Sequence, residues 1–158
     1  MSKSLKRVTK ALDEAGIVAN IREMPGLTRT AQQAADAAGC HLDQIAKSII
    51  FRGNISGTAI LFLTAGGNQV DAAKAGDVAG EPLGKADAGL IRAQTGFAIG
   101  GVSPFGHLNP ITAYMDARLL EFGVIWAAAG TPRHIFAVDP QVVQRVTGAQ
   151  IADFLARQ

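Results

Sequence analysis

Two features of this sequence could do chemistry together: a lone lysine and a glycine-rich loop. Lys47 is the only charged residue in the apolar run 44–51. The segment 100–107 reads Gly-Gly-Val-Ser-Pro-Phe-Gly-His and lies between two apolar segments. Because glycine has no Cβ, such a loop lets main-chain N–H groups converge on a ligand. A cation and a set of N–H donors indicate a site for a small molecule or an acyl group.

Lys47 has two interpretations. If 44–51 is a strand, alternation puts Lys47 on the same face as Ile45, Ile49 and Phe51. Burial of an unpartnered ammonium among such residues is costly. Either Lys47 lies at the start of the strand and extends its charge into solvent, or it lines a pocket and binds a phosphate, carboxylate or carbonyl oxygen.

The glycine-rich loop is also open to two interpretations: an ordinary surface turn, or a set of amides that stabilises an oxyanion. It lacks the Gly-Lys-Ser/Thr ending of a phosphate-binding P-loop. Ser103 and His107 raise the possibility of nucleophilic catalysis. However, Ser103 precedes Pro104, which favours an extended backbone rather than the sharp turn of a nucleophile elbow. A serine hydrolase is therefore disfavoured.

The remaining polar residues suggest structural roles. The three histidines are scattered and Cys40 is the only cysteine, so neither a metal site nor a disulfide is expected. Asp116 and Asp139 lie at element junctions, where capping is expected. A basic helix face is either solvated or in contact with a phosphate backbone; it comprises Lys3, Lys6, Arg7 and Lys10.

Composition predicts one folded domain over residues 1–158. Hydrophobic residues make up 48% and charged residues 18%, below the usual share of about a quarter. The net charge of +2 permits contact with a polyanion without requiring it. No apolar run approaches the roughly 18 residues of a membrane span, and the N-terminus lacks the apolar region of a signal peptide. With a single cysteine, this predicts a cytoplasmic protein in a reducing compartment.

Periodicity and capping residues predict a mixed α+β domain. Ser4 is expected to cap the first helix, Thr30 the second and Asp71 the third, and a hairpin is expected to join strands 45–51 and 58–64. The expected helices and helical turns are 5–15, 31–38, 72–78, 88–95, 117–120, 140–146 and 151–155. The expected strands are 17–22, 45–51, 58–64, 111–115, 124–128 and 134–138.

The lysine segment Gln-Ile-Ala-Lys-Ser-Ile-Ile-Phe, followed later by Gly-Gly-Val-Ser-Pro-Phe-Gly, resembles the YbaK/prolyl-tRNA editing family. The similarity covers most of the chain. The other motifs that carry it, in chain order, are Asp-Ala-Ala-Lys at 71–74, Thr-Gly-Phe at 95–97, Met-Asp-Ala-Arg-Leu-Leu at 115–120, Ala-Gly-Thr-Pro-Arg-His at 129–134 and Thr-Gly-Ala at 147–149.

The resemblance implies an α+β fold around a curved, mixed, mostly antiparallel sheet with flanking helices. It also implies that Lys47 engages the substrate near its terminal phosphate or ester, and that the amides of Gly100 and Gly101 hold the aminoacyl carbonyl. Neither a cofactor nor a metal is implied. The further substrate contacts that we expect are Thr30, Ser48, Val102, Ser103, Pro104, Phe105, Gly106 and His134.

The implied activity is hydrolysis of the ester that joins an amino acid to the 3′ ribose of tRNA. No general base is evident in the sequence, and the family places the base on the substrate, as a 2′-hydroxyl or the thiol of cysteine. We expect Cys-tRNA-Pro, or another small amino acid on tRNA-Pro, as the substrate, and prolyl-tRNA synthetase as a partner. The alternative is a non-catalytic member that binds tRNA or a synthetase.

Overall fold

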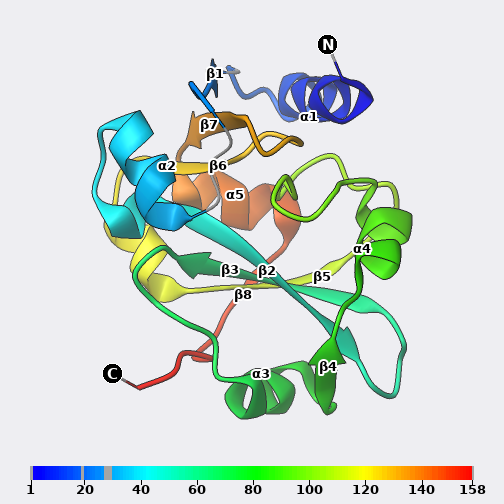
Figure 1. Ribbon diagram of the computed structural model, residues 1–158. Coiled ribbons are helices and arrows are strands. Elements are labelled where there is room, and N and C mark those ends of the chain that lie inside the picture. Colours follow the sequence, from blue (N-terminus) through cyan, green and yellow to red (C-terminus); the bar gives the residue numbers. More distant parts are fainter. Residues whose placement is uncertain (1, 19, 27–29, 158) are drawn as a thin grey trace.

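A five-stranded mixed sheet forms the centre of the molecule (Figure 1). The computed structural model describes residues 2–18, 20–26 and 30–157. Within the sheet, β2 pairs antiparallel with β3 and β4, whereas β5 pairs parallel with β3 and β8. The strands, in sheet order, are β4 (Leu83–Lys85), β2 (Ala46–Gly53), β3 (Ala59–Ala65), β5 (Thr112–Met115) and β8 (Gln150–Ile151).

A second, antiparallel sheet has the order β1-β7-β6, with β1 at Ile21–Glu23, β7 at His134–Val138 and β6 at Ile125–Ala128. A parallel bridge between Ile45 and Trp126 joins it to the start of β2. The arrangement is therefore the mixed, mostly antiparallel α+β fold that the resemblance implied, although it is divided into two sheets rather than one curved sheet.

The helices after the first begin where their capping residues predict. Thr30 forms a capping box with Gln33 at the start of α2, and Asp71, Asp87 and Asp139 accept N–H hydrogen bonds at the starts of α3, α4 and α5. The helices are α1 (Lys3–Glu14), α2 (Ala31–Ala38), α3 (Ala72–Ala79), α4 (Ala88–Thr95) and α5 (Pro140–Thr147), with 3-10 turns η1 (Leu42–Gln44) and η2 (Ala117–Glu121). Among the described residues, no helix is both long and apolar enough to cross a membrane.

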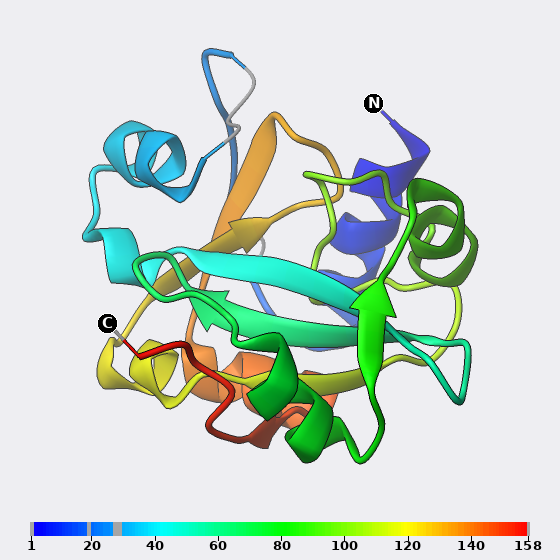
Figure 2. The ribbon, with the colours of Figure 1, turned by 60° about the horizontal axis from the view of Figure 1, so that its bottom comes forward.

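Both faces of the five-stranded sheet are covered, so every residue of β3 is buried. On one face Leu61 and Leu63 join the main core, which includes residues of α1, α4 and α5. On the other face Phe62 packs with Phe154 and with Ala75 of α3. Figure 2 shows α3 and the C-terminal segment against this second face, on which Lys47 also lies because it is two residues from Ile49.

The sequence-based predictions were wrong at the chain ends. Ser2, not Ser4, caps α1, and of the described residues in 17–22 only Ile21 and Arg22 belong to a strand. Residue 19 lies outside the described residues. The predicted tail helix 151–155 is absent: Leu155 instead bridges to Val70, and its carbonyl accepts a hydrogen bond from Lys74. These tertiary contacts oppose local helix formation. The short strands β4 and β8 carry too few residues to show a period.

Candidate active site

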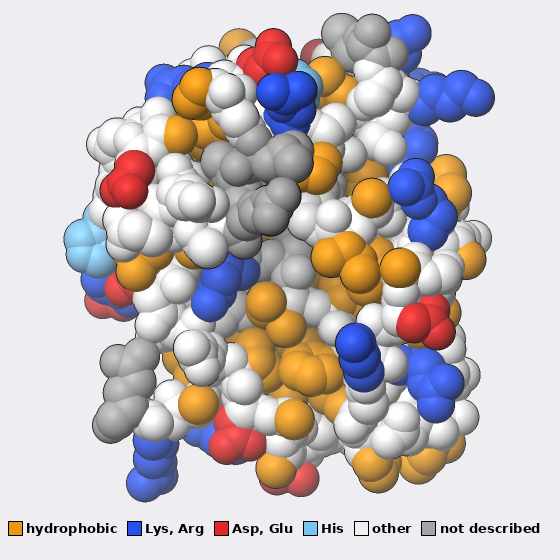
Figure 3. Space-filling view, in the orientation of Figure 1, with side chains coloured by type: hydrophobic (Ala, Val, Ile, Leu, Met, Phe, Trp, Pro, Cys, Tyr) orange, Lys and Arg blue, Asp and Glu red, His pale blue; other side chains and the backbone are white. Residues whose placement is uncertain are grey.

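A small cavity of about 260 Å³ opens beside the start of β2. Lys47 and Ser48 line it from β2, Gly100 and Val102 from the glycine-rich loop, and Thr30 from the start of α2. Its other walls are mostly apolar, with Ala31 and Ala34 from α2, Trp126 from β6 and Ile135 from β7. The bridge between Ile45 and Trp126 brings these two sheets together at this point. On the face of the molecule seen in Figure 3, hydrophobic side chains lie near the centre, with Lys or Arg side chains close to them.

Lys47 is partly buried at the second position of β2. Its Nζ atom donates to the main-chain oxygen of Asn68 at 2.5 Å, and no described carboxylate forms an ion pair with it. Burial lowers the pKa of the Lys47 ammonium, and the negative charges of Asp116 and Asp43 oppose part of that shift. Lys47 is therefore partly desolvated and lies at the wall of a cavity rather than fully in solvent. Its ammonium has one hydrogen-bond acceptor among the described residues.

Gly100 and Gly101 need to be glycines for different reasons. Gly100 has a φ of +89°, in the left-handed region. A Cβ at Gly101 would lie 2.8 Å from the Cα of Thr131. The N–H of Gly101 already donates to the oxygen of Ala98 at 3.0 Å, whereas those of Gly100 and Val102 form no hydrogen bond within the described part of the chain. The glycine-loop residues that line the cavity and whose N–H groups have no acceptor among the described residues are therefore Gly100 and Val102.

The second half of the loop lies away from Lys47. Ser103 is fully buried, and its hydroxyl accepts the N–H of Phe105 at 3.2 Å. Its carbonyl lies 2.5 Å from Nε2 of His107, so that nitrogen carries the proton. Pro104, Phe105 and Gly106 line a separate cavity beside Leu108. The structure thus does not bring Ser103, Pro104, Phe105 or Gly106 to the Lys47 cavity, and their contacts shape the loop.

Burial lowers the pKa of His107; the carbonyl of Ser103 opposes this shift, and the nearby charge of Arg7 adds to it. Arg7 was expected on a basic outer face. Its guanidinium instead donates to the main-chain oxygens of Gly96 at 2.7 Å and Gly106 at 3.3 Å, and it stacks on Phe97. Arg7 therefore ties α1 to the glycine-rich loop, and only Lys3, Lys6 and Lys10 remain as the exposed basic residues of that face.

Of three other predicted substrate contacts, two line the cavity and one does not. Thr30 lines the cavity, and its side chain also caps α2. Ser48 lines the cavity with a buried hydroxyl that has no hydrogen-bond partner in the described structure. Such a hydroxyl normally has a partner, so a ligand or water is expected there. His134 is not among the lining residues: its Nδ1 lies 2.6 Å from the hydroxyl of Thr131, behind Gly101.

Sequence reasoning missed two parts of this site. The apolar wall, with Ala34, Trp126 and Ile135, carried no signal because apolar residues in helices and strands usually mark a core. The contact between Lys47 and Asn68 was missed because a main-chain acceptor in a loop leaves no trace in residue type.

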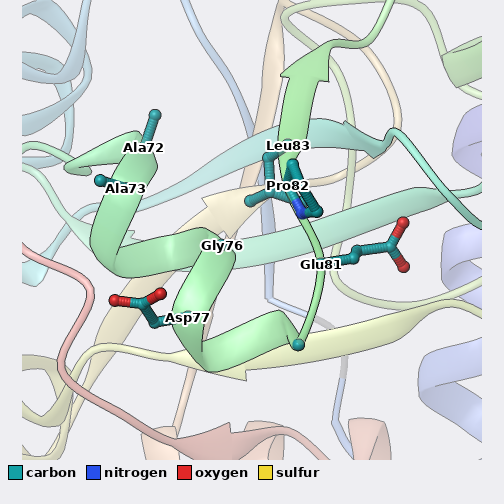
Figure 4. A pocket seen from close by; sticks show the side chains of 8 residues that line it. Ala72, Ala73, Gly76, Asp77, Glu81, Pro82 and Leu83 are labelled. Atoms are coloured by element: carbon teal, nitrogen blue, oxygen red, sulfur yellow. The ribbon is translucent and has the colours of Figure 1, made fainter.

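A larger cavity of about 620 Å³ lies between α3 and β4 (Figure 4). Small residues of α3 line it, together with Asp77 and Glu81. None of its described lining residues is a lysine or arginine. The carboxylate of Glu81 is already occupied by the N–H groups of Ile55 and Ser56, each at 2.9 Å. The larger cavity therefore offers no cation to an anion or an ester, and the smaller one is the better candidate site.

The α+β fold, with a lysine and glycine-loop amides around a small apolar cavity, is the class of structure that the sequence motifs implied. The chain belongs to the aminoacyl-tRNA editing domain family, whose model matches residues 26–146. This confirms the resemblance to the YbaK-type editing domains, a family whose role is to hydrolyse aminoacyl-tRNA.

Two curated relatives match most of the chain. "Uncharacterized protein YwhH" of Bacillus subtilis is 28% identical over 148 residues, 94% of each chain. "Putative Cys-tRNA(Pro)/Cys-tRNA(Cys) deacylase EbsC" of Enterococcus faecalis is 23% identical over 133 residues, 82% of this chain and 79% of that protein.

Solved structures agree on the fold. One described as "a putative trans-editing enzyme for prolyl tRNA synthetase" is 45% identical, with a TM-score of 0.91 over 100% of this chain and 99% of that one. Another, "hypothetical protein APE2540", is 25% identical, with a TM-score of 0.86 over 95% of this chain and 99% of that one.

Proposed function

We propose that the protein is a trans-editing deacylase that hydrolyses the ester of mischarged tRNA, with Cys-tRNA-Pro, or another small amino acid on tRNA-Pro, as its substrate. One observation carries the proposal. Lys47, with its partly buried side chain, lines one small cavity together with Gly100 and Val102, whose N–H groups form no hydrogen bond within the described part of the chain.

In the proposed reaction, a water oxygen adds to the ester carbonyl carbon. The bond from that carbon to the 3′ ribose oxygen then breaks, and the 3′ oxygen takes up a proton. The carbonyl oxygen becomes negative on the way, and Lys47 with the loop N–H groups stabilises it. None of the described residues that line the cavity is an Asp, Glu or His. The attacking water therefore gives its proton to the substrate: either to the 2′-hydroxyl of the terminal adenosine, which passes its own proton to the departing 3′ oxygen, or to the cysteine side chain in its thiolate form.

The cavity suits a small side chain. Its volume of about 260 Å³ is below the range of roughly 300 to 1,000 Å³ that is usual for ligand pockets. Apolar walls such as Ala34 and Trp126 favour a methyl or thiol group over a charged one. Because an apolar pocket discriminates one methylene by only about 1–3 kcal/mol, these few wall residues decide between cysteine and its small competitors.

The partners in this proposal are the acceptor end of tRNA and prolyl-tRNA synthetase. A net charge of +2 predicts weak binding of tRNA alone, so the synthetase would supply much of the affinity. A salt titration of tRNA binding tests this part. Tight binding at physiological salt without the synthetase would contradict it.

Deacylation of a panel of labelled aminoacyl-tRNAs tests the proposal. The panel holds Cys-, Ala-, Ser- and Pro-tRNA-Pro and Cys-tRNA-Cys, with the wild type run beside Lys47→Ala. We expect Lys47-dependent loss of Cys-tRNA-Pro, or of one other small mischarged species, with Pro-tRNA-Pro spared. A flat panel would contradict the deacylase and favour a module that binds tRNA or a synthetase without catalysis.

A further inference from the structure

We propose that Asn68 and Asp116 are positioning residues that hold the ammonium of Lys47 at the wall of the cavity. This inference rests on the proposed function for its effect on catalysis. Neither residue lines the cavity, and both act through Lys47. The hydrogen bonds lead from the buried carboxylate of Asp116 to Asn68, in the loop after β3, and from Asn68 to Lys47.

Asp116 is a fixed point behind the site. It is only 2% exposed. Its Oδ2 accepts the N–H of Ala65 at 3.1 Å and Nδ2 of Asn68 at 2.9 Å, and its Oδ1 accepts the N–H of Arg118 at 2.9 Å. Three donors from β3, the following loop and η2 therefore converge on one carboxylate, which joins these three segments of the chain.

Asn68 links Asp116 to Lys47 through hydrogen bonds. Its main-chain N–H donates to the oxygen of Ala65 at 2.9 Å, and its side chain is held by Asp116. Lys47 pairs with Thr64 across β2 and β3, so the loop at 66–68 turns back toward Lys47. The carbonyl of Asn68 then accepts the Lys47 Nζ. One of the three ammonium hydrogens is thereby directed, and the other two have no acceptor among the described residues.

The charges around Lys47 are arranged without a direct ion pair. Asp43 lies on η1 and already accepts the N–H of Gly67 at 2.7 Å and Nε of Arg118 at 3.0 Å. Asp116 is likewise occupied by its three donors. Both carboxylates act on Lys47 through space, with Arg118 the nearby opposing charge. The two carboxylates thus oppose the lowering of the Lys47 pKa, and no described carboxylate accepts a hydrogen of its ammonium.

The direct test is Asn68→Ala, assayed on the substrate that the wild type hydrolyses. We expect kcat to fall about tenfold with KM changed less than about twofold, because a misdirected ammonium weakens transition-state stabilisation more than binding. The matched control is Asn109→Ala, which removes an amide that hydrogen-bonds to the main-chain oxygens of Ala93 and Gln94, outside the Lys47 cavity. It should leave kcat unchanged.

A second variant, Asp116→Asn, has a different signature. Loss of a negative charge near Lys47 lowers the pKa of the ammonium further. The alkaline limb of the pH–rate profile should therefore move to lower pH, whereas in Asn68→Ala it should stay close to the wild-type position. If Asp116→Asn does not fold, Asn68→Ala alone decides the question.

A titration of the Lys47 side chain by NMR separates the failure of this inference from that of the proposed function. If the wild type hydrolyses no aminoacyl-tRNA but Asn68→Ala changes the chemical shift of the Lys47 side chain while Asn109→Ala does not, the positioning network stands and the deacylase fails. If the wild type is active and Lys47-dependent but Asn68→Ala keeps full kcat with only a lower Tm, the two residues are merely structural and the inference is overturned.

Discussion

Lys47 and Lys74 lie in two regions of the molecule and differ in how many hydrogen-bond acceptors surround the ammonium group. Nζ of Lys74 contacts both carboxylate oxygens of Asp153 at 3.0 Å and the oxygen of Leu155 at 2.8 Å, so its hydrogens are used within the chain. Nζ of Lys47 has one main-chain acceptor among the described residues. Because the ammonium of Lys47 has fewer acceptors among the described residues than that of Lys74, Lys47 is the lysine available to a ligand.

The cavities in the two regions make the same contrast. The larger one lies at α3, the helix that carries Lys74, and carries Asp77 and Glu81. The smaller one is lined by Lys47, by Gly100 and Val102 of the glycine-rich loop, and by Ser48, whose buried hydroxyl has no partner among the described residues. Cavity size therefore does not identify the candidate site here, whereas unsatisfied polar groups do.

Removal of each lysine in turn should show the largest difference between the regions. Lys47→Ala should lower kcat/KM by about 100-fold or more, since it deletes a donor to the developing oxyanion. Lys74→Ala should change kcat/KM less than about twofold, because it breaks an ion pair with Asp153 and a hydrogen bond to Leu155, neither of which lines the Lys47 cavity. Initial rates of deacylation measure both. Equal losses of kcat/KM in the two variants would show that Lys47 has no special role in catalysis.

Filling each cavity should give an intermediate effect. Ala34→Leu adds volume to the Lys47 cavity and should lower kcat/KM about tenfold, mainly through KM, because it competes with the substrate side chain for space. Ala73→Leu adds the same volume beside the larger cavity and should have no effect. Circular dichroism checks that both fold. A loss of activity in Ala73→Leu alone would move the site to α3.

The sequence predicted this contrast only in part. Lys47 and the glycine-rich loop were identified because a charge in an apolar run and clustered glycines depart from ordinary patterns. The caps Thr30, Asp71 and Asp139 were predicted because capping is local chemistry. Periodicity could not predict contacts between residues far apart in the sequence. Arg7 of α1 donates to the carbonyl of Gly106, and Lys47 donates to that of Asn68. The complete burial of Ser103 was likewise not predictable.

The smallest expected effect concerns pH and the Lys74 region. Hydrogen bonds from Lys74 and from the N–H of Leu155 hold the pKa of Asp153 below its usual range. The stability from this group is therefore present above the unfolded pKa of about 3.9 and is lost as pH falls through the lower folded value. Asp153→Asn should lower the Tm slightly at pH 7, with the difference vanishing in acid. A large, pH-independent loss would show that the pair is structural.

The proposed editing activity is tested most directly by the single-turnover hydrolysis of Cys-tRNA-Pro and Pro-tRNA-Pro, in parallel, by the wild type and Lys47→Ala. We expect rapid loss of the cysteinyl ester and survival of the prolyl ester with the wild type. With Lys47→Ala, we expect the cysteinyl ester to be lost at a rate near the uncatalysed one. Equal hydrolysis of both esters, or a wild-type rate that does not depend on Lys47, would contradict it.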